Sequence, residues 1–383
     1  MNLYNENNNA QKTIIVLGTG APQADLIKAC KERGLKVFGC SYRSGDMAEH
    51  LLDHFEQINI IDVEKVTEYA RRVGADMIYS AGSDVAMPTI AAVSEQIGLP
   101  CFIDSRTASI CHDKVAARAA IGFDEPFNLK FIELYELPEK LDFDYPCIMK
   151  PSDSQGQRGV HLINSFDELR KYFEHSISYS HKGSVIVEEY ADGPEISVNA
   201  FSIDGKVRFA LMSERFAWNN YPGGLIHFHK LPAAYQENEV FSEQLSYLIS
   251  RVCEIFRINN GPSYFQIKVT QNMTLPKLIE VAPRLDGCHM WNLIKHSTGV
   301  DLLDATVSLL CGEKTVFPDH YEVKTYSTEF LCSPPDVPFD RSKYDIKDAE
   351  YLKWYYESGD NVKRMNGFME KGGYIIYPGG PRL

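Results

Sequence analysis

The sequence predicts an α/β protein that opens with a parallel sheet and continues as a mixed α+β module. The first observation is an apolar, β-rich run at residues 13–17, which is followed by a glycine-containing turn, a segment of helical spacing and a second apolar run. This β–α–β order produces parallel strands. The second observation is a change near Phe127, after which short strands follow one another through turns. With 383 residues, the chain has room for two or three domains.

The N-terminal part, residues 1–111, is expected to form a Rossmann-like domain. The turn after its first strand carries Gly18 and Gly20, but Gln23 occupies the position of the third glycine of a dinucleotide fingerprint. The second strand ends at Cys40 without the acidic residue that would bind a ribose, which argues against a nicotinamide cofactor. Strands are expected at residues 13–17, 35–40, 57–60, 76–80 and 99–103, and helices at residues 24–33, 63–73 and 84–97.

Residues 112–312 are expected to hold the α+β module, and residues 313–383 a small C-terminal domain. A helix at residues 105–121, capped by Asp104 or Ser105, leads into the module. The C-terminal segment is rich in Pro, Tyr and Asp and ends in a predicted strand. Strands are expected at residues 145–150, 160–163, 184–190, 195–203, 207–215, 225–231, 263–270, 278–281 and 372–378, and helices at residues 166–175, 239–256 and 290–311.

Charge and cysteine content argue against several classes of function. The formal net charge of −13 argues against a general nucleic-acid partner and against an anionic membrane surface. The nine cysteines are scattered and contain no CxxC pair, which is typical of the reducing cytoplasm and predicts neither a disulfide framework nor a zinc site. Residues 1–11 lack the apolar region of a signal peptide, and no apolar run approaches the ~20 residues that span a bilayer. We therefore expect a cytoplasmic protein.

Residues 262–287 predict a β-hairpin with a candidate site for a metal ion and a phosphate. Antiparallel pairing would set Gln266 near Glu280, because facing residues of paired strands lie about 5 Å apart. Glu280 is a carboxylate within an apolar strand, so it should face a cation or a wet cleft. Arg284 follows four residues later. Two oxygen ligands and a guanidinium favour a Mg²⁺–phosphate complex, and the alternative is an ordinary ion pair between Glu280 and Arg284 at a sheet edge.

A second candidate phosphate site follows the strand that ends at Lys150. The polar loop after it contains Gly156 and Gly159. Backbone N–H groups in such a loop can curl over phosphate oxygens, with the lysine as a point charge beneath them. The sequence is not a Walker A loop, and the alternative is a flexible surface hairpin.

A candidate nucleotide-binding edge follows the apolar strand at residues 185–190. The strand turns acidic at Glu188 and Glu189. Its backbone groups could pair with a purine, and Glu195, beyond the next turn, could accept hydrogen bonds from a ribose. The alternative is that Glu188 and Glu189 face the solvent.

The order of these motifs resembles the ATP-grasp superfamily, and the resemblance extends from about residue 12 to the C-terminus. It implies that the α+β module has two lobes. The run from Glu280 to Arg284, with Gly287, is similar to the branch that includes the L-amino acid ligases. The chain also resembles the ATP-grasp modules of biotin carboxylase and of the carbamoyl phosphate synthetase large chain. The motifs are Lys114, Lys150 with its glycine loop, the acidic strand end with Gly193, Pro194 and Glu195, and the hairpin with Gln266, Glu280 and Arg284.

The resemblance also implies a role for each residue. Many members carry an acidic residue in place of Gln266 and an Asn metal ligand in place of Ala282, so the second metal would be held differently here. The residues implied are Lys114 and Lys150 at the phosphates, Ser154, Gly156 and Gly159 in a lid loop, Glu188, Tyr190 and Ala191 at the adenine, Glu195 at the ribose, Gln266 and Glu280 at Mg²⁺ (or Mn²⁺), and Arg284, with Lys150, in catalysis.

The activity that the resemblance implies is the ATP-dependent ligation of a carboxylate to an amine through an acyl phosphate, with release of ADP and phosphate. The expected partners are small-molecule acids and amines, and the resemblance allows a homodimer. The alternatives are a carboxylase that forms carboxyphosphate from bicarbonate and a non-catalytic nucleotide-binding or scaffold protein.

Three further features of the sequence could have either a functional or a purely structural role. His227 and His229 lie two residues apart on a predicted strand and could help to bind a substrate carboxylate, but no third metal ligand is visible near them, which favours ordinary strand histidines. The segment at residues 221–224, after Trp218, suggests either a mobile aromatic loop beside the acceptor substrate or a surface loop. Cys288 and His289 are adjacent, and adjacent side chains rarely point together, so we expect a structural role for both.

Overall fold

The computed structural model describes residues 11–154, 158–218, 225–270, 272–365 and 368–382. The chain divides into two compact units, one of residues 1–105 and 303–316 and the other of residues 106–302 and 317–383. The three-domain division expected from the sequence, with boundaries after residues 111 and 312, stays a prediction.

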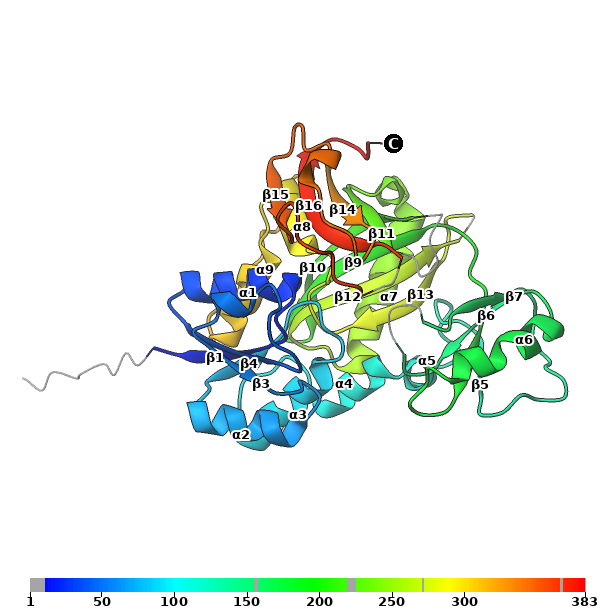
Figure 1. Ribbon diagram of the computed structural model, residues 1–383. Coiled ribbons are helices and arrows are strands. Elements are labelled where there is room, and N and C mark those ends of the chain that lie inside the picture. Colours follow the sequence, from blue (N-terminus) through cyan, green and yellow to red (C-terminus); the bar gives the residue numbers. More distant parts are fainter. Residues whose placement is uncertain (1–10, 155–157, 219–224, 271, 366–367, 383) are drawn as a thin grey trace, which may run out of the picture. The chain divides into compact units, whose positions relative to one another are not determined.

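The first unit is built on a four-stranded parallel sheet with the strand order β3-β2-β1-β4 (Figure 1). All five residues of β1 are buried, which fits their continuous apolar sequence because a parallel strand is covered on both faces. The α/β fold class is confirmed. The strands are β1 (Thr13–Leu17), β2 (Lys36–Ser41), β3 (His54–Gln57) and β4 (Met77–Tyr79), and the helices are α1 (Ala21–Glu32), the 3-10 helix η1 (Glu49–Leu51), α2 (Val63–Val73), α3 (Met87–Ile97) and most of α9 (Leu302–Leu310).

Two predicted strands of the first unit are wrong. Residues 99–103 form no strand, and Pro100 has no N–H group to donate to a sheet. The third strand was predicted at residues 57–60 but lies at His54–Gln57, where it pairs with β2. The apolar residues that suggested a strand come after its end.

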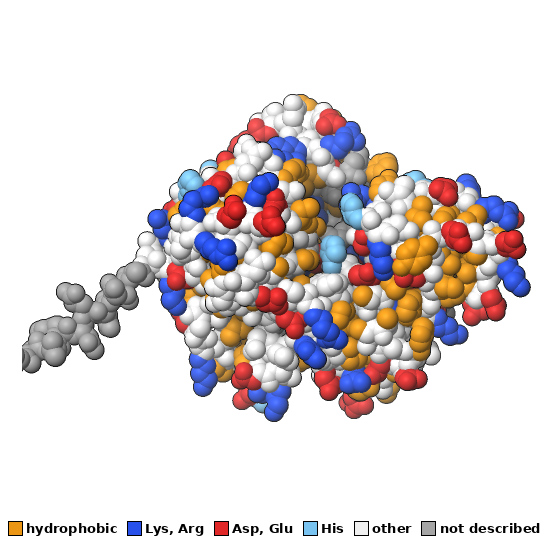
Figure 2. Space-filling view, turned by 90° about the horizontal axis from the view of Figure 1, so that it is seen from below, with side chains coloured by type: hydrophobic (Ala, Val, Ile, Leu, Met, Phe, Trp, Pro, Cys, Tyr) orange, Lys and Arg blue, Asp and Glu red, His pale blue; other side chains and the backbone are white. Residues whose placement is uncertain are grey.

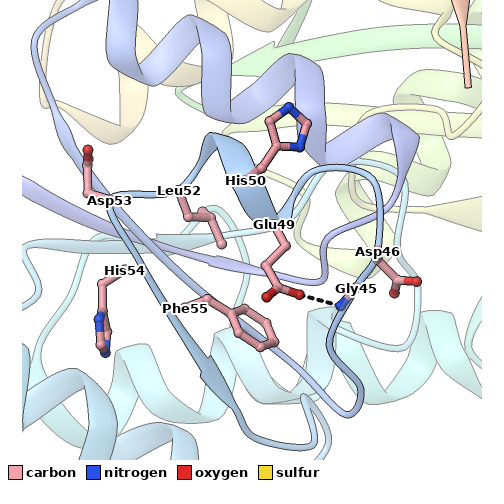
Figure 3. A pocket seen from close by; sticks show the side chains of 8 residues that line it. All are labelled: Gly45, Asp46, Glu49, His50, Leu52, Asp53, His54 and Phe55. Carbon is pink, nitrogen blue, oxygen red and sulfur yellow. Dashed lines mark hydrogen bonds between the residues drawn. The ribbon is translucent and has the colours of Figure 1, made fainter.

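An open hollow of the first unit lies beside η1 and β3 (Figure 3). Gly45 donates its backbone N–H to the Glu49 carboxylate at 2.6 Å on one side of it. None of the residues expected to bind a nucleotide or a metal ion lines this hollow. The candidate site therefore has to be sought in the second unit.

The second unit contains two antiparallel sheets (Figure 1). The larger has the strand order β13-β12-β9-β10-β11-β14-β16-β15, and the smaller has the order β5-β8-β6-β7. The larger sheet consists of β9 (Glu195–Ile203), β10 (Lys206–Ala217), β11 (Ile226–Leu231), β12 (Gly261–Val269), β13 (Pro276–Ala282), β14 (Tyr326–Ser333), β15 (Tyr351–Trp354) and β16 (Glu370–Pro378). The smaller consists of β5 (Phe131–Leu134), β6 (Cys147–Pro151), β7 (His161–Ile163) and β8 (Val185–Glu189). The helices are α4 (Ser105–His112), α5 (Lys114–Ile121), α6 (Phe166–Ile177), α7 (Glu239–Phe256) and α8 (Met290–Thr298), with the 3-10 helices η2 (Ala234–Glu237) and η3 (Arg341–Lys343).

Each sheet of the second unit is covered by a helix. Helix α7 buries an apolar stripe of helical spacing, and this stripe shares one core with β9, β12 and β13. Helix α6 packs Leu169 and Phe173 into the core of the smaller sheet, beside Met149 and Val187. Each sheet therefore has its own hydrophobic core. These two cores fix the positions of the strands that carry the predicted site residues.

The second unit differs from the prediction in four places. The helix expected at residues 105–121 is divided, because the Asp113 carboxylate caps a new helix, α5, by accepting from the N–H groups of Val115 and Ala116. The helix expected at residues 290–311 is divided at Gly299, whose φ of +79° is a left-handed C-cap. Strand β5 was not predicted. The C-terminal segment adds three strands rather than one, and β14 joins them to β11.

The surface carries charged side chains of both signs. On the face shown in Figure 2, acidic and basic side chains are interspersed rather than gathered into one basic area. Of the helices that the structure describes, none has the length and apolar composition needed to cross a bilayer.

Candidate functional site

The hairpin of β12 and β13 places Gln266 directly opposite Glu280, as predicted. A register shift follows immediately after Gln266. Gln266 is buried and Glu280 is half-buried. The same register sets Ala282 opposite Tyr264, so no oxygen ligand replaces the missing Asn at that position.

A hydrogen bond fixes the orientation of the Gln266 amide. Its Nε2 donates to Glu195 Oε2 at 2.8 Å, which leaves Oε1 as the atom that can bind a cation. Glu195 also pairs with Arg215 at 2.6 Å and with Lys268 at 3.4 Å. The carboxylate predicted at the ribose is therefore already held by three neighbours, which position it beside the predicted metal ligand.

Lys114 begins α5 and reaches back to the loop after β6. Its Nζ donates to the backbone carbonyl of Ser154, and its N–H donates to the carbonyl of Ser152 at 3.0 Å. Burial lowers the pKa of Lys114, and the negative charge of Glu280 acts against this effect while the positive charge of Lys150 adds to it. Glu280 and Lys150 thus both lie close enough to Lys114 to act on its charge, which brings two cations and a carboxylate together at this place.

Lys150 and Arg118 share the carboxylate of Glu188. Arg118 Nε donates to Glu188 Oε1 at 2.7 Å, and Lys150 Nζ contacts Oε2. Burial by itself would raise the pKa of Glu188, but the two cations hold it at about 2. Solvent exposure of this residue, one alternative raised by the sequence, is wrong.

Arg118 is the residue of this cluster that the sequence analysis missed. Its guanidinium also donates to the carbonyl of Ile279 on β13 at 2.9 Å and to the side chain of Asn128 at 3.3 Å. It therefore connects the hairpin to the smaller sheet. The available signal was spacing, because Lys114, Arg118 and Ile121 recur at i, i+4 and i+7, on one face of a helix.

The adenine-binding residues were predicted around the end of β8. Strand β8 is paired with β5 and β6 along its length, and this pairing ends at Glu189. An adenine would therefore meet the backbone of Tyr190 and Ala191 rather than the Glu188 side chain. Tyr190 is 36% exposed, whereas Ala191 is buried.

A close backbone approach follows at Gly193. Its φ is +119°, and a Cβ atom there would lie 1.9 Å from the carbonyl oxygen of Val269 on β12. Lys268 Nζ donates to the Gly193 carbonyl at 2.9 Å. Glycine is thus required for the turn that leads from β8 into Glu195 and the larger sheet.

The loop after β6 is anchored at both described ends. Asp153 accepts from the hydroxyl of Ser180 at 2.7 Å. Gly159 has a φ of +70°, and its carbonyl accepts from the hydroxyl of Ser176 on α6 at 2.8 Å. Gly156, the third residue expected in this lid loop, lies outside the described residues.

Arg284 is buried just beyond β13. Its Nη1 donates to the carbonyl of Leu285 at 3.0 Å, and its guanidinium carbon lies 5.6 Å from the centre of the Tyr264 ring. It therefore lies beside β12, on which Gln266 follows Tyr264 by two residues.

The histidines have different neighbours. His227 stacks on Trp218 with ring centres 3.7 Å apart, and His229 lies 3.3 Å from the hydroxyl of Ser213. His289 stacks on Tyr374, while its neighbour Cys288 contacts a lysine. The residues of the loop expected at 221–224 are outside the described residues.

Comparisons with known proteins find a similarity to one enzyme family. Residues 143–291 match the family model of the ATP-grasp domain. Carnosine synthase 1 of Mus musculus is 23% identical over 84% of this chain and 42% of its own length, and an ATP-grasp enzyme of Aspergillus fumigatus, fsqD, is 23% identical over 76% and 57%. The chain thus spans about half the length of these relatives. The L-amino acid ligase from Bacillus licheniformis has a similar structure, with a TM-score of 0.75, 17% identity and coverage of 96% of this chain and 93% of that one.

Proposed function

We propose that this chain, whose residues 143–291 form an ATP-grasp domain, is an ATP-dependent ligase that joins a carboxylate to an amine. The observation that carries the proposal is the placement of Glu280 directly opposite Gln266, with Glu280 and Lys150 both close enough to Lys114 to act on its charge. It combines two cations for phosphate oxygens, the buried Lys150 and the half-buried Lys114, with two oxygen ligands for a divalent cation.

The donor set fits Mg²⁺. This ion commonly binds one or two carboxylates and completes its coordination with water and substrate phosphates. Glu280 offers the carboxylate, and Gln266 offers the Oε1 that its contact with Glu195 leaves available. When bound, Mg²⁺ would neutralise phosphate charge, and we expect Mn²⁺ to substitute for it.

The other residues would act by binding and orientation. Lys114 and Lys150 would bind phosphate oxygens, and Lys150 would do so while Arg118 keeps Glu188 paired. Arg284 would bind the acceptor carboxylate through its planar set of donors. No protein nucleophile is required, so catalysis would rest on positioning and on electrostatic stabilisation.

The proposed reaction has two steps. A carboxylate oxygen attacks the γ-phosphorus of ATP, the bond from this phosphorus to the β–γ bridging oxygen breaks, and ADP leaves. The amine nitrogen then attacks the acyl carbon, phosphate departs with the electron pair of the C–O bond, and the nitrogen loses a proton. We further propose small-molecule substrates, no nucleic-acid partner and a cytoplasmic location, in keeping with the net charge of −13 and the scattered cysteines.

A screen of phosphate release with pairs of acids and amines tests the proposal. Release of phosphate that needs both partners, together with an amide product detected by mass spectrometry, is the expected result, and Glu280→Gln is the control for contaminating activity. Release that needs bicarbonate and no amine would instead identify a carboxylase. ATP binding without turnover over a broad panel would identify a nucleotide-binding protein without ligase activity.

A further inference from the structure

A cluster of three potential metal ligands, two of them buried and one half-buried, lies in the second unit. His229, Asp286 and Cys288 each offer one ligand atom, and these atoms all lie within 4.8 Å of one another. His229 belongs to β11, and the other two belong to the loop between β13 and α8. None of the three is among the residues proposed to bind ATP or Mg²⁺.

Two polar atoms of these side chains are buried without a hydrogen-bond partner among the described residues. These atoms are Nε2 of His229, whose side chain is fully buried, and Oδ2 of Asp286, which is 5% exposed as a residue. A buried polar atom without a partner costs about 1–3 kcal/mol. A ligand that bound both atoms would remove this cost.

The remaining polar atoms of the same side chains are held in place. The hydroxyl of Ser213 lies 3.3 Å from Nδ1 of His229, so that Nδ1–H can donate to it and Nε2 can present its lone pair. The N–H of Cys288 donates to Oδ1 of Asp286 at 3.0 Å, which leaves Oδ2 directed elsewhere. Supporting contacts of this kind orient the ligands of known metal sites.

The charges near the cluster suit a divalent cation bound to a thiolate. Burial raises the pKa of the Cys288 thiol, and Lys371, whose Nζ lies 3.5 Å from Sγ, acts against this effect. Burial lowers the pKa of His229, and Arg215 and Lys371 act in the same direction, so the imidazole is neutral. One thiolate, one carboxylate and a neutral imidazole together balance a charge of 2+. Arg215 is already paired with the carboxylate of Glu195.

We propose that His229, Asp286 and Cys288 bind a divalent transition-metal ion such as Zn²⁺. Nitrogen and sulfur ligands select Zn²⁺ or Co²⁺ over Mg²⁺, which prefers oxygen. Tetrahedral Zn²⁺ would bring the ligand atoms to separations of about 3.3–3.7 Å. The separations between the three ligand atoms would thus have to shorten by at most about 1.5 Å, and a fourth coordination position would stay open.

Titration of the full chain with Co²⁺ tests this site directly. The protein is produced without a histidine tag, stripped with EDTA and titrated in the absence of ATP. We expect saturation at about one equivalent, with a thiolate-to-cobalt charge-transfer band in the near ultraviolet and d–d bands of tetrahedral intensity. Cys288→Ser should abolish the charge-transfer band, and His229→Gln should weaken binding by more than the about 10–100-fold that loss of a supporting contact costs.

Two controls separate this site from other sources of binding. Cys101→Ser changes a half-buried cysteine of the first unit and should leave the band intact, and Glu280→Gln should also leave it intact because Glu280 belongs to the proposed Mg²⁺ site. Asp286→Asn is the third variant of the cluster and should also weaken binding, and circular dichroism verifies that each variant is folded. A spectrum without a saturable charge-transfer band, or a band that Cys288→Ser does not change, would overturn the proposal. The titration contains no substrates, so its result is independent of ligase activity.

Discussion

Replacing Glu188 with Gln would leave two buried cations without their shared counter-charge. Arg118 and Lys150 have side chains that are 3% and 8% exposed, and both contact the Glu188 carboxylate, which is 2% exposed. Gln has nearly the shape of Glu, so the change is mainly electrostatic. We expect the free energy of unfolding of the second unit to fall by about 3–5 kcal/mol, the usual cost of removing one partner from a buried ion pair.

The pKa of Glu188 gives a second value for this expected fall in the free energy of unfolding. Burial alone would raise the pKa, but Lys150 and Arg118 lower it from 4.5 to about 2. At about 1.4 kcal/mol per pH unit, this interval corresponds to about 3 kcal/mol. Because the folded pKa lies below the unfolded one, the stabilisation is present above pH 4.5 and is lost as the pH falls from 4.5 towards 2. The difference between wild type and Glu188→Gln should shrink over the same interval.

Urea unfolding followed by tryptophan fluorescence measures this effect. All three Trp residues lie in residues 106–302 or 317–383, so the signal reports on the second unit. The matched control is Glu189→Gln, because Glu189 is partly exposed and its ion pair with Lys277, at 3.5 Å, should contribute no more than about 1 kcal/mol. Equal losses of stability in the two variants, or a loss in Glu188→Gln that is as large at about pH 3.5 as at about pH 7, would refute the reasoning.

Four further substitutions test the site. Glu280→Gln should abolish turnover while ATP still binds weakly, because it removes the carboxylate of the proposed metal site; near-normal phosphate release would contradict its role. Arg284→Lys keeps the charge but loses the planar set of donors, so kcat should fall at least about 100-fold while the Kd for ADP, measured by calorimetry, changes little; an unchanged kcat with weaker ADP binding would show that Arg284 is a phosphate anchor. Glu195→Ala should raise the KM for ATP more than it lowers kcat, and a pure kcat defect would count against ribose contact. Gly193→Ala would place a Cβ 1.9 Å from a carbonyl oxygen, so the urea midpoint should drop by an amount equivalent to about 2 kcal/mol or more, and an unchanged midpoint would rule out the close approach.

Contacts between neighbours in sequence could be predicted, whereas contacts between distant segments could not. The pairing of Gln266 with Glu280 follows from one hairpin, because a turn fixes the register of two adjoining strands. The pairing of Arg118 with Glu188 joins residues 70 positions apart. A carboxylate at a strand end has the same sequence signal whether it faces water or a buried guanidinium, so the sequence could not choose between these environments.

The same limit explains the missed cluster and the missed strands. His229 was set aside because no third metal ligand lay near it in sequence, yet Asp286 and Cys288 come from a loop more than 50 residues later. Strand β14 mixes polar and apolar residues, and β15 has only four residues. Neither shows a clear alternation of apolar and polar residues. Pairing stabilises both strands, β14 with β11 and β16, and β15 with β16.

The first unit consists of two stretches of chain that are far apart in sequence, and this sets the order in which it can be completed during synthesis. Arg33 donates to Asp304 at 2.5 Å, to Glu313 at 2.8 Å and to Ser308 at 2.6 Å, and the buried side chains of α9 belong to this unit as well. Residues 1–105 emerge from the ribosome first, and residue 316, which ends the second stretch, follows 316 − 105 = 211 residues later. At about 5–20 residues per second, the parallel sheet waits about 10–40 s for the segment that completes it. During this interval, the surface that later contacts α9 is available to chaperones, and a fragment that ends at residue 105 would expose it permanently.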